Sequence, residues 1–331
     1  MKKVSIKDVA KEAGVSITTV SRALNGYMDV SEKTRKHILE VVERLDYAPD
    51  LNARSLGGKA DTTIALLTSE LTPTNESGFV YGLISGLFRQ CNDMGCEFVL
   101  LATNTMKQQK LSFLQLCKRK NLSGVVVTGL KVDDPYYHEI LDSDIPCAII
   151  DMPVRGRKKC EIAVDNVAAS KEAAAYLIGL GHRNIGMING GKTADVSGQR
   201  YSGYVSALVE AGIPLQLDYM KYCDFLEDTA CEKTEELLTK YPEITALFCA
   251  SDVMAIGAIR AVEQMGMRVP EDISVMGFDD IPIAPYVYKG ISTVRQSPLL
   301  MGIEGGKAIW KMLSGEEVDS RVILPHEMVI R

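Results

Sequence analysis

The sequence predicts an α/β protein in which an N-terminal three-helix headpiece and a hinge helix precede a two-lobed core of doubly wound parallel sheets. Residues 1–47 contain three short capped helical patterns, and from residue 62 apolar strands alternate with amphipathic helical stretches. Charge divides at the same point: residues 1–60 hold 11 Lys/Arg and 8 Asp/Glu, whereas the remainder holds 26 and 35. This asymmetry predicts that only the N-terminal module contacts nucleic-acid phosphates.

Each of the three predicted headpiece helices begins at a serine that can cap its first turn. Ser5 is followed three residues later by Asp8, which is a capping-box pattern. Ser16 and Ser31 precede the second and third helices, and Gly14 supplies the turn after the first. Apolar residues at helical spacing give each helix a face that can be buried: Ile6, Val9 and Ala10; Val20 and Leu24; Ile38, Val41, Val42 and Leu45.

The first two helices and their glycine turn form a helix-turn-helix pattern, which ends at the Asn-Gly pair of residues 25–26. The second helix would lie in the major groove of DNA. Arg22 can reach guanine O6 and N7, Thr18 can donate to a base or phosphate, and Ile17 can contact a thymine methyl group. The alternative is that these are only solvated helix residues, but the caps, turn and third helix in register favour DNA binding. The candidate DNA-binding residues of the helix-turn-helix are Ser16, Ile17, Thr18, Ser21, Arg22 and Asn25.

A further short helix is predicted in the hinge segment over residues 48–60. Asp50 can cap about two turns that end at Gly57 and Gly58, well below the ~12–15 residues that an isolated helix needs. We therefore expect this helix to fold only when something supports it. Leu56 lies between Arg54 and Lys59, which fits an apolar wedge in the minor groove. The alternative is a plain glycine-terminated linker.

Two successive runs of strands predict the two lobes of the core. The first run is Ile64–Leu67, Glu97–Leu101, Gly124–Val127 and Cys147–Ile150, and the second is Ile162–Val164, Ile185–Ile188, Ala246–Cys249 and Ser274–Phe278. We expect a headpiece over residues 1–47, a hinge over 48–60 and a core over 61–331. Within the core, one lobe would comprise about 61–161 and 292–320, and the other about 162–291 and 321–331.

Polar residues at the ends of these strands are the candidate ligand-binding groups, because ligands of parallel sheets bind at the carboxyl ends of the strands. With two lobes, the natural site is the cleft between them. Carboxylates, amides and one arginine around an aromatic ring suit a polyhydroxylated ligand, since each can pair two hydroxyls. The alternative is that Asp165 and Ser251 are only helix caps, and that Asp279 lies in a simple turn. The candidates are Ser69, Glu70, Phe79, Asp165, Arg200, Phe225, Ser251, Asp279 and Gln296.

Composition argues against several other kinds of protein. The eight cysteines include no C-x-x-C pair, the four histidines are dispersed, and no Ser-His-Asp or metal-like cluster is apparent. We expect free thiols in a reducing cytoplasm, and neither a metal nor a cofactor. The N-terminus lacks the apolar core of a signal peptide, and no apolar run reaches membrane-spanning length.

Residues 186–193 match the P-loop pattern G-x-x-x-x-G-K-T and so raise a nucleotide-hydrolysing alternative. Gly186 lies inside the predicted strand Ile185–Ile188, whereas a P-loop glycine begins the loop after a strand. The nearest acidic strand end, Asp151, lies upstream rather than downstream. We therefore do not expect an enzyme. A second alternative, a solute-binding protein without regulatory role, conflicts with the headpiece and the missing signal peptide.

Residues 3–59 resemble the headpiece of the lactose-repressor/galactose-repressor (LacI/GalR) family through the motifs IKDVAKEAGVS, TTVSRALNG, VSEKTR and LDYAPDLNARSL. The resemblance implies that Ile17, Thr18 and Arg22 read the major groove. It also implies that the hinge helix folds only on DNA, where Leu56 from two subunits kinks a central base step beside Asn52 and Ala53. Ile17 departs from the polar residue often found there.

The resemblance continues through the core in LGHRNIGMING and ASDVMAIGAIRAVEQMGMRVPEDISVMGFDDIPIAPY, which implies a periplasmic-binding-protein-like fold. On it, Arg200, Phe225, Asp279 and Gln296 fall on sugar- or base-contacting positions. The segment of residues 70–79 departs from the shorter family pattern and reshapes one wall of the pocket.

The partners implied are a pseudo-palindromic operator, a second copy of the chain and a small effector, most simply a sugar or sugar derivative. The predicted function is therefore a repressor of transcription whose operator affinity the effector controls. A phosphocarrier protein as co-regulator stays open, and no membrane partner is expected. The chain stops at residue 331 without an apolar heptad tail, so we expect no tetramer.

Overall fold

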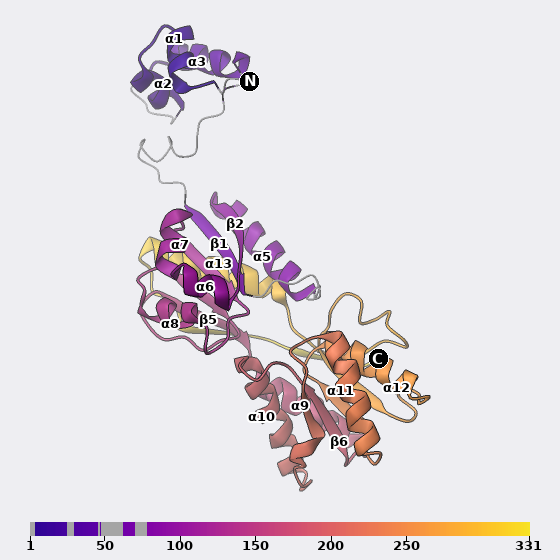
Figure 1. Ribbon diagram of the computed structural model, residues 1–331. Helices are drawn as coiled ribbons and strands as arrows, with labels where there is room; N and C mark the ends of the chain where they lie inside the picture. The colour runs from indigo at the N-terminus through magenta and orange to yellow at the C-terminus, as the bar shows by residue number, and fades with distance from the viewer. Residues whose placement is uncertain (1–3, 25–29, 46, 48–61, 70–77) are drawn as a thin grey trace. The chain divides into compact units, whose positions relative to one another are not determined.

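The structure is a computed structural model of the 331-residue chain, and it describes residues 4–24, 30–45, 47, 62–69 and 78–331. The chain divides into two units, residues 1–62 and residues 63–331, and each is described by itself (Figure 1). The predicted hinge helix lies outside the described residues, as do these predicted site residues: Asn25, Asn52, Ala53, Leu56 and Glu70.

The described part of the first unit contains the three predicted helices, α1 (Ile6–Glu12), α2 (Ile17–Leu24) and α3 (Glu32–Arg44). The capping box is present at α1, where the Ser5 backbone N–H donates to the Asp8 carboxylate at 2.9 Å. The Ser31 hydroxyl accepts from the Thr34 backbone N–H at 3.2 Å and begins α3. Gly14 adopts a φ of +65°, a left-handed conformation that costs glycine little, and so it turns the chain between α1 and α2.

A small apolar core joins these three helices. Val9, Val20 and Ile38 are completely buried, one from each helix. On α2 the second buried position is Ala23, whereas Leu24 is only partly buried against the same cluster. The predicted apolar faces therefore pack together, except that Ala23 rather than Leu24 is the second buried residue of α2. The opposite side of α2 stays exposed.

Replacing Ser31 with alanine is expected to destabilise α3 by about 0.5–2 kcal/mol, because the Thr34 N–H loses its acceptor. Amide hydrogen exchange of α3 in the full chain measures this loss as faster exchange along the helix. Ser31→Thr keeps a hydroxyl acceptor and serves as the control. Unchanged protection in Ser31→Ala would show that the cap contributes nothing.

The second unit contains two six-stranded sheets. The first has the order β11-β5-β4-β3-β1-β2, and the second has the order β12-β10-β9-β8-β6-β7. All pairs are parallel except β10 with β12. The strands of the first sheet are β1 (Thr63–Ser69), β2 (Glu97–Thr103), β3 (Gly124–Thr128), β4 (Cys147–Ile150), β5 (Lys159–Val164) and β11 (Arg321–Leu324). Those of the second are β6 (Ile185–Asn189), β7 (Met220–Tyr222), β8 (Ala246–Cys249), β9 (Ser274–Asp279), β10 (Ser292–Arg295) and β12 (Glu327–Val329).

Strand pairing corrects the predicted allocation of residues to the two lobes in three places. β5, which contains the predicted strand Ile162–Val164, pairs with β4 in the first sheet rather than opening the second. β10 pairs with β9, so residues 292–295 belong to the second sheet. β11 pairs with β5, so residues 321–324 return to the first. The prediction was wrong because it followed chain order, whereas the chain passes from one sheet to the other three times.

Helices cover both faces of the first sheet. Along β1, Ile64 and Leu66 join one apolar cluster with α5 and α13, whereas Ala65 and Leu67 join another with α7 and α8. This alternation follows from the two-residue repeat of a strand. The helices of this lobe are α5 (Gly78–Met94), α6 (Thr105–Lys110), α7 (Phe113–Arg119), α8 (Pro135–Asp142) and α13 (Pro298–Ser314).

The second sheet carries two helix pairs, in which α9 packs on α10 and α11 packs on α12 (Figure 1). These helices are α9 (Asn166–Gly179), α10 (Asp195–Glu210), α11 (Glu227–Lys240) and α12 (Asp252–Gln264), and a 3-10 turn covers Leu217–Tyr219. In the part of the chain that the structure describes, no helix is long and apolar enough to span a membrane.

Candidate DNA-binding face and effector cavity

The exposed face of α2 carries the predicted base-reading residues that the structure describes. Ile17 is 43% exposed, Thr18 and Arg22 are exposed, and Ser21 is half-buried. Residues four apart lie on one side of a helix, so Thr18 and Arg22 share a stripe beside Ile17 and Ser21. The Ser16 hydroxyl accepts from the Thr19 N–H at 3.1 Å, so Ser16 caps the helix. An amphipathic α2 with this polar outer face is suited to the major groove.

A cavity of about 540 Å³ lies in the second unit, where the carboxyl ends of strands from both sheets contribute to its wall. From the first sheet come Ser69 after β1, Thr128 at the end of β3, and Asp151 after β4. From the second come Ser251 after β8 and Asp279 at the end of β9. The cavity therefore occupies the predicted position between two parallel sheets.

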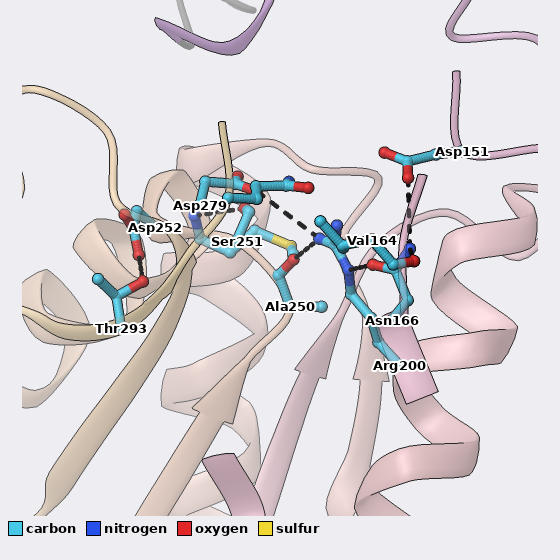
Figure 2. Close-up of polar contacts among 12 residues, drawn as sticks. Asp151, Val164, Asn166, Arg200, Ala250, Ser251, Asp252, Asp279 and Thr293 are labelled. Carbon is cyan, nitrogen blue, oxygen red and sulfur yellow. Dashed lines mark hydrogen bonds and ion pairs between the residues drawn. The ribbon is translucent and has the colours of Figure 1, made fainter. Parts of the chain in front are cut away.

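A continuous chain of polar contacts crosses the floor of this cavity (Figure 2). Asn166 donates to the Asp151 carboxylate at 3.3 Å and accepts from Arg200 Nε at 2.9 Å. Arg200 Nη1 also donates to the Ala250 carbonyl and lies 4.0 Å from Asp279 Oδ1. The guanidinium stacks on the Phe278 ring at 3.8 Å, and Arg200 is only 3% exposed. Arg200 is thus held rigidly between two carboxylates.

Burial changes the acidity of these carboxyl groups. It raises the pKa of Asp151 to about 6, with Arg200 and the Asn166 amide opposing the shift. Burial also raises the pKa of Asp279 to about 6, opposed by Arg200 and by the hydrogen bond from Gln296. Burial lowers the pKa of Arg200, and the nearby side chains of Asp279, Asp151 and Asp252 oppose that shift. At neutral pH both carboxylates are therefore predominantly ionised, and they are poised to accept hydrogen bonds.

The loop after β9 holds Asp279 in an unusual backbone conformation. Asp279 has a φ of +115° and Asp280 a φ of +56°, values that side-chain-bearing residues adopt only with support. Asp280 binds Arg295 at 2.7 Å and Arg331 at 2.6 Å. Asp252 accepts from the Ile281 N–H at 2.9 Å. These contacts fix the loop, and with it the Asp279 carboxylate at the cavity.

The native protein is expected to lose folding stability as pH rises toward 8, and replacing Asp252 with asparagine is expected to make that loss smaller. Burial, with Asp279 nearby, raises the pKa of Asp252 to about 8, against about 4 in an unfolded chain. The folded state therefore holds a proton that the unfolded state has released, so stability falls with rising pH until about pH 8.

Urea denaturation midpoints at pH 6.5 and 8.5 bracket the titration of Asp252, whereas Asp151 and Asp279 titrate near pH 6. Buried thiols such as Cys91, Cys117 and Cys147, whose pKa values burial raises, also lower stability as pH rises, but they do so equally in the native chain and in the variant. We expect the midpoint of the native chain to fall between these pH values and that of Asp252→Asn to fall less. The control is Glu263→Gln, an exposed site on α12. Equal slopes in the native chain and Asp252→Asn would contradict the assigned pKa.

Phe225 forms an aromatic wall of the cavity because Gly190 leaves room for it. A Cβ at Gly190 would lie 2.1 Å from the Phe225 ring. Gly186 lies within β6, as predicted, and a Cβ there would lie 2.8 Å from the Leu247 side chain. Lys192 lies over the Tyr222 ring at 5.5 Å. The glycines of the P-loop-like run 186–193 therefore serve packing of the strand and of Phe225.

Seven of the nine predicted effector residues line the cavity: Ser69, Phe79, Arg200, Phe225, Ser251, Asp279 and Gln296. The prediction for Asp165 was wrong. Asp165 is exposed, and its carboxylate accepts from the Ala168 N–H at 2.9 Å, so it caps α9 instead. Ser251 has both functions, because it lines the cavity and accepts from the Met254 N–H at 3.2 Å.

The sequence prediction missed Asp151 and Asn166 as site residues. Asp151 was recognised only as an acidic strand end, although the rule that selected Ser69 and Asp279 applies equally to it. Asn166 follows the capping residue Asp165 and is completely buried, which alternation along a strand does not reveal. Asp165 directly follows the predicted strand Ile162–Val164, so the strand-end rule selects it instead of Asn166.

Comparison with known proteins identifies both units. Residues 5–50 match the family described as bacterial regulatory proteins, lacI family. Residues 174–331 match the periplasmic binding protein-like domain. The chain is 32% identical to the probable HTH-type transcriptional repressor ExuR of Bacillus subtilis, over 99% of this chain and 97% of that protein. It is 30% identical to catabolite control protein A of Priestia megaterium, over 99% and 98%.

Solved structures agree with these relationships. A Lac repressor dimer bound to operator and the anti-inducer ONPF matches with a TM-score of 0.86 and 26% identity, over 100% of this chain and 98% of that one. The transcriptional regulator CelR in complex with cellobiose matches with a TM-score of 0.76 and 29% identity, over 99% of both chains. The chain therefore belongs to the lacI family of bacterial regulatory proteins, DNA-binding transcriptional regulators under the control of small-molecule effectors.

Proposed function

We propose that this chain is a cytoplasmic, homodimeric repressor that binds a pseudo-palindromic operator and changes its affinity when a sugar-like effector occupies the cavity. The observation that carries the proposal is that one chain has both an exposed polar face on α2 and, between two sheets, a cavity whose wall combines apolar side chains with a few polar groups. The CelR structure contains cellobiose, which supports a sugar-like ligand for a cavity of this type. The proposal includes DNA contacts by Asn25, Asn52, Ala53 and Leu56, and it does not require a phosphocarrier co-regulator.

The proposed mechanism is a shift in population between two arrangements of the sheets. Ligand groups that bridge Asp151, after the first sheet's β4, and Arg200, on the second lobe's α10, would favour one arrangement. Because operator and effector then act on the same equilibrium, each changes the affinity of the other by the same factor. Whether the effector weakens or strengthens operator binding depends on which arrangement it favours.

Exposed apolar side chains at one edge of the first sheet support the proposed dimer. β2 is the edge strand, with Leu100 41% exposed, and the adjacent α5 has Phe88 51% exposed. Phe88 also contacts Phe98 edge-on at 6.0 Å. Large apolar groups gathered at an unpaired edge are typical of an association surface. Sedimentation velocity is expected to give a dimer, and a stable tetramer would contradict the assembly proposed.

The function is tested by selecting operator sequences from a random DNA library with the full chain. Fluorescence anisotropy then measures affinity for the selected duplex and for a scrambled duplex of equal length. We expect the selected sequence to bind at least about 10³-fold more tightly. A sugar that binds the cavity should change the operator affinity and leave binding to the scrambled duplex unaltered. Equal affinity for both duplexes would contradict the proposal.

A further inference from the structure

One buried acceptor beside the cavity has no hydrogen-bond partner among the described residues. Gln296 is only 4% exposed and lines the cavity. Its Nε2 is committed to Asp279 Oδ1 at 2.6 Å, so the orientation of the amide is set by that carboxylate. Gln296 Oε1 is buried and has no hydrogen-bond partner among the described residues. Buried acceptors without a partner are rare in folded proteins, so Gln296 marks this end of the cavity as short of hydrogen-bond donors.

The ionisable groups of the wall have an acidic balance. Among the residues that the structure describes they are Lys131, Arg200, Asp151, Asp195, Asp224 and Asp279, two cations against four carboxylates. The one deeply buried cation, Arg200, is already neutralised by Asp279 at 4.0 Å and by nearby Asp151. An anionic group at the cavity floor would therefore lie beside two carboxylates in surroundings of low polarity, where like charges repel strongly.

We propose that the effector of this cavity is a molecule rich in hydroxyl or ammonium donors that carries no anionic group, and that sugar acids and sugar phosphates are rejected. This inference rests on the proposed function, because it names the ligand class of the same cavity. Ligand donors would bond to the carboxylates of Asp151 and Asp279. Phe225 offers an apolar face to the ring of the ligand.

The direction in which ligand affinity changes with pH distinguishes donor-rich ligands without an anionic group from anionic ligands. Ligand hydroxyls or an ammonium group stabilise the ionised carboxylates, so binding should weaken as pH falls below about 6. The groups that act on Asp151 are Arg200, the Asn166 amide, Asp279 and Glu161. Those that act on Asp279 are Arg200 and Gln296. An anionic ligand would show the reverse, because protonation of either carboxyl removes repulsion.

The test is isothermal titration and thermal shift of the full chain with matched sugars in the gluco, galacto and manno series. Each series comprises the hexose, its 2-amino-2-deoxy derivative, its hexuronate and its 6-phosphate. We expect at least one hexose or amino sugar to bind at pH 7.5, with its uronate and phosphate at least about tenfold weaker, and binding to weaken at pH 5.5. A uronate or phosphate that binds more tightly than its hexose overturns the proposal, as does the absence of binding by every hexose and amino sugar.

Asp151→Asn removes one negative charge with little change of shape. We expect it to lower the ratio of hexose affinity to uronate affinity by at least about tenfold. Glu263→Gln, the same change at an exposed site on α12, should leave the preference unaltered. An unaltered affinity ratio in a folded Asp151→Asn protein counts against the inference, and the pH dependence of ligand binding by the native chain tests it without any variant.

If a sugar acid binds and alters operator affinity, this inference fails while the proposed function stands. If no operator sequence is preferred, the proposed function itself fails.

Discussion

Replacing Asp279 with alanine is expected to abolish the effector response while operator affinity is retained. Asp279 accepts from Gln296 at 2.6 Å and lies 4.0 Å from Arg200 at the cavity floor. Losing a ligand hydrogen bond to this charged group costs about 1.5–3 kcal/mol of binding, which is roughly 10- to 150-fold in effector affinity. Asp279 belongs to the second unit, so the α2 face that we propose to contact DNA is left unaltered.

The measurement is operator anisotropy with and without the sugar that raises the melting temperature of the native chain. Asp279→Asn keeps the size of the side chain and separates loss of charge from loss of fold. Glu263→Gln, on the exposed side of α12, is the matched control for removal of one carboxylate. If a folded Asp279→Ala protein loses operator binding and keeps its effector affinity, the assignment of the cavity is wrong.

Arg22→Ala is expected to weaken binding to the selected operator by about 1–3 kcal/mol, roughly 5- to 150-fold, and to relax the choice of one base pair. Arg22 is exposed on α2, while Val20 and Ala23 on the opposite side are buried. The substitution therefore alters the exposed side of α2, which we propose to face DNA, and leaves the headpiece core intact. Alanine also favours the helix.

The control is Lys36→Ala, which removes one positive charge from the exposed side of α3. A residue that contacts only phosphate, or nothing, changes affinity for all sequences alike. We expect Arg22→Ala to reduce the ratio of the affinity for the selected duplex to the affinity for the scrambled duplex, and Lys36→Ala to leave that ratio unaltered. A uniform loss in Arg22→Ala would show that Arg22 contacts the backbone and not a base.

Local rules predicted the headpiece well because its determinants are close in sequence. Ser5 with Asp8, Gly14 and Ser31 act within one turn of the residues they cap or redirect. The strand-end rule also found most of the cavity, since parallel strands bring their carboxyl ends to one edge whatever their order. Asp165 failed because a residue at a strand end is equally well placed to cap the next helix.

The sequence by itself determined the element types, the three capped helices of the headpiece, the apolar strands and the kind of polar residue at each strand end. Only the tertiary structure decided which sheet receives β5, β10 and β11, because hydrogen bonds between distant strands make that choice. It also decided that Asn166, and not Asp165, joins Asp151 to Arg200. Burial of these three side chains shifts the pKa values of the cavity's ionisable groups. Burial is a property of the packed molecule rather than of any short run of residues.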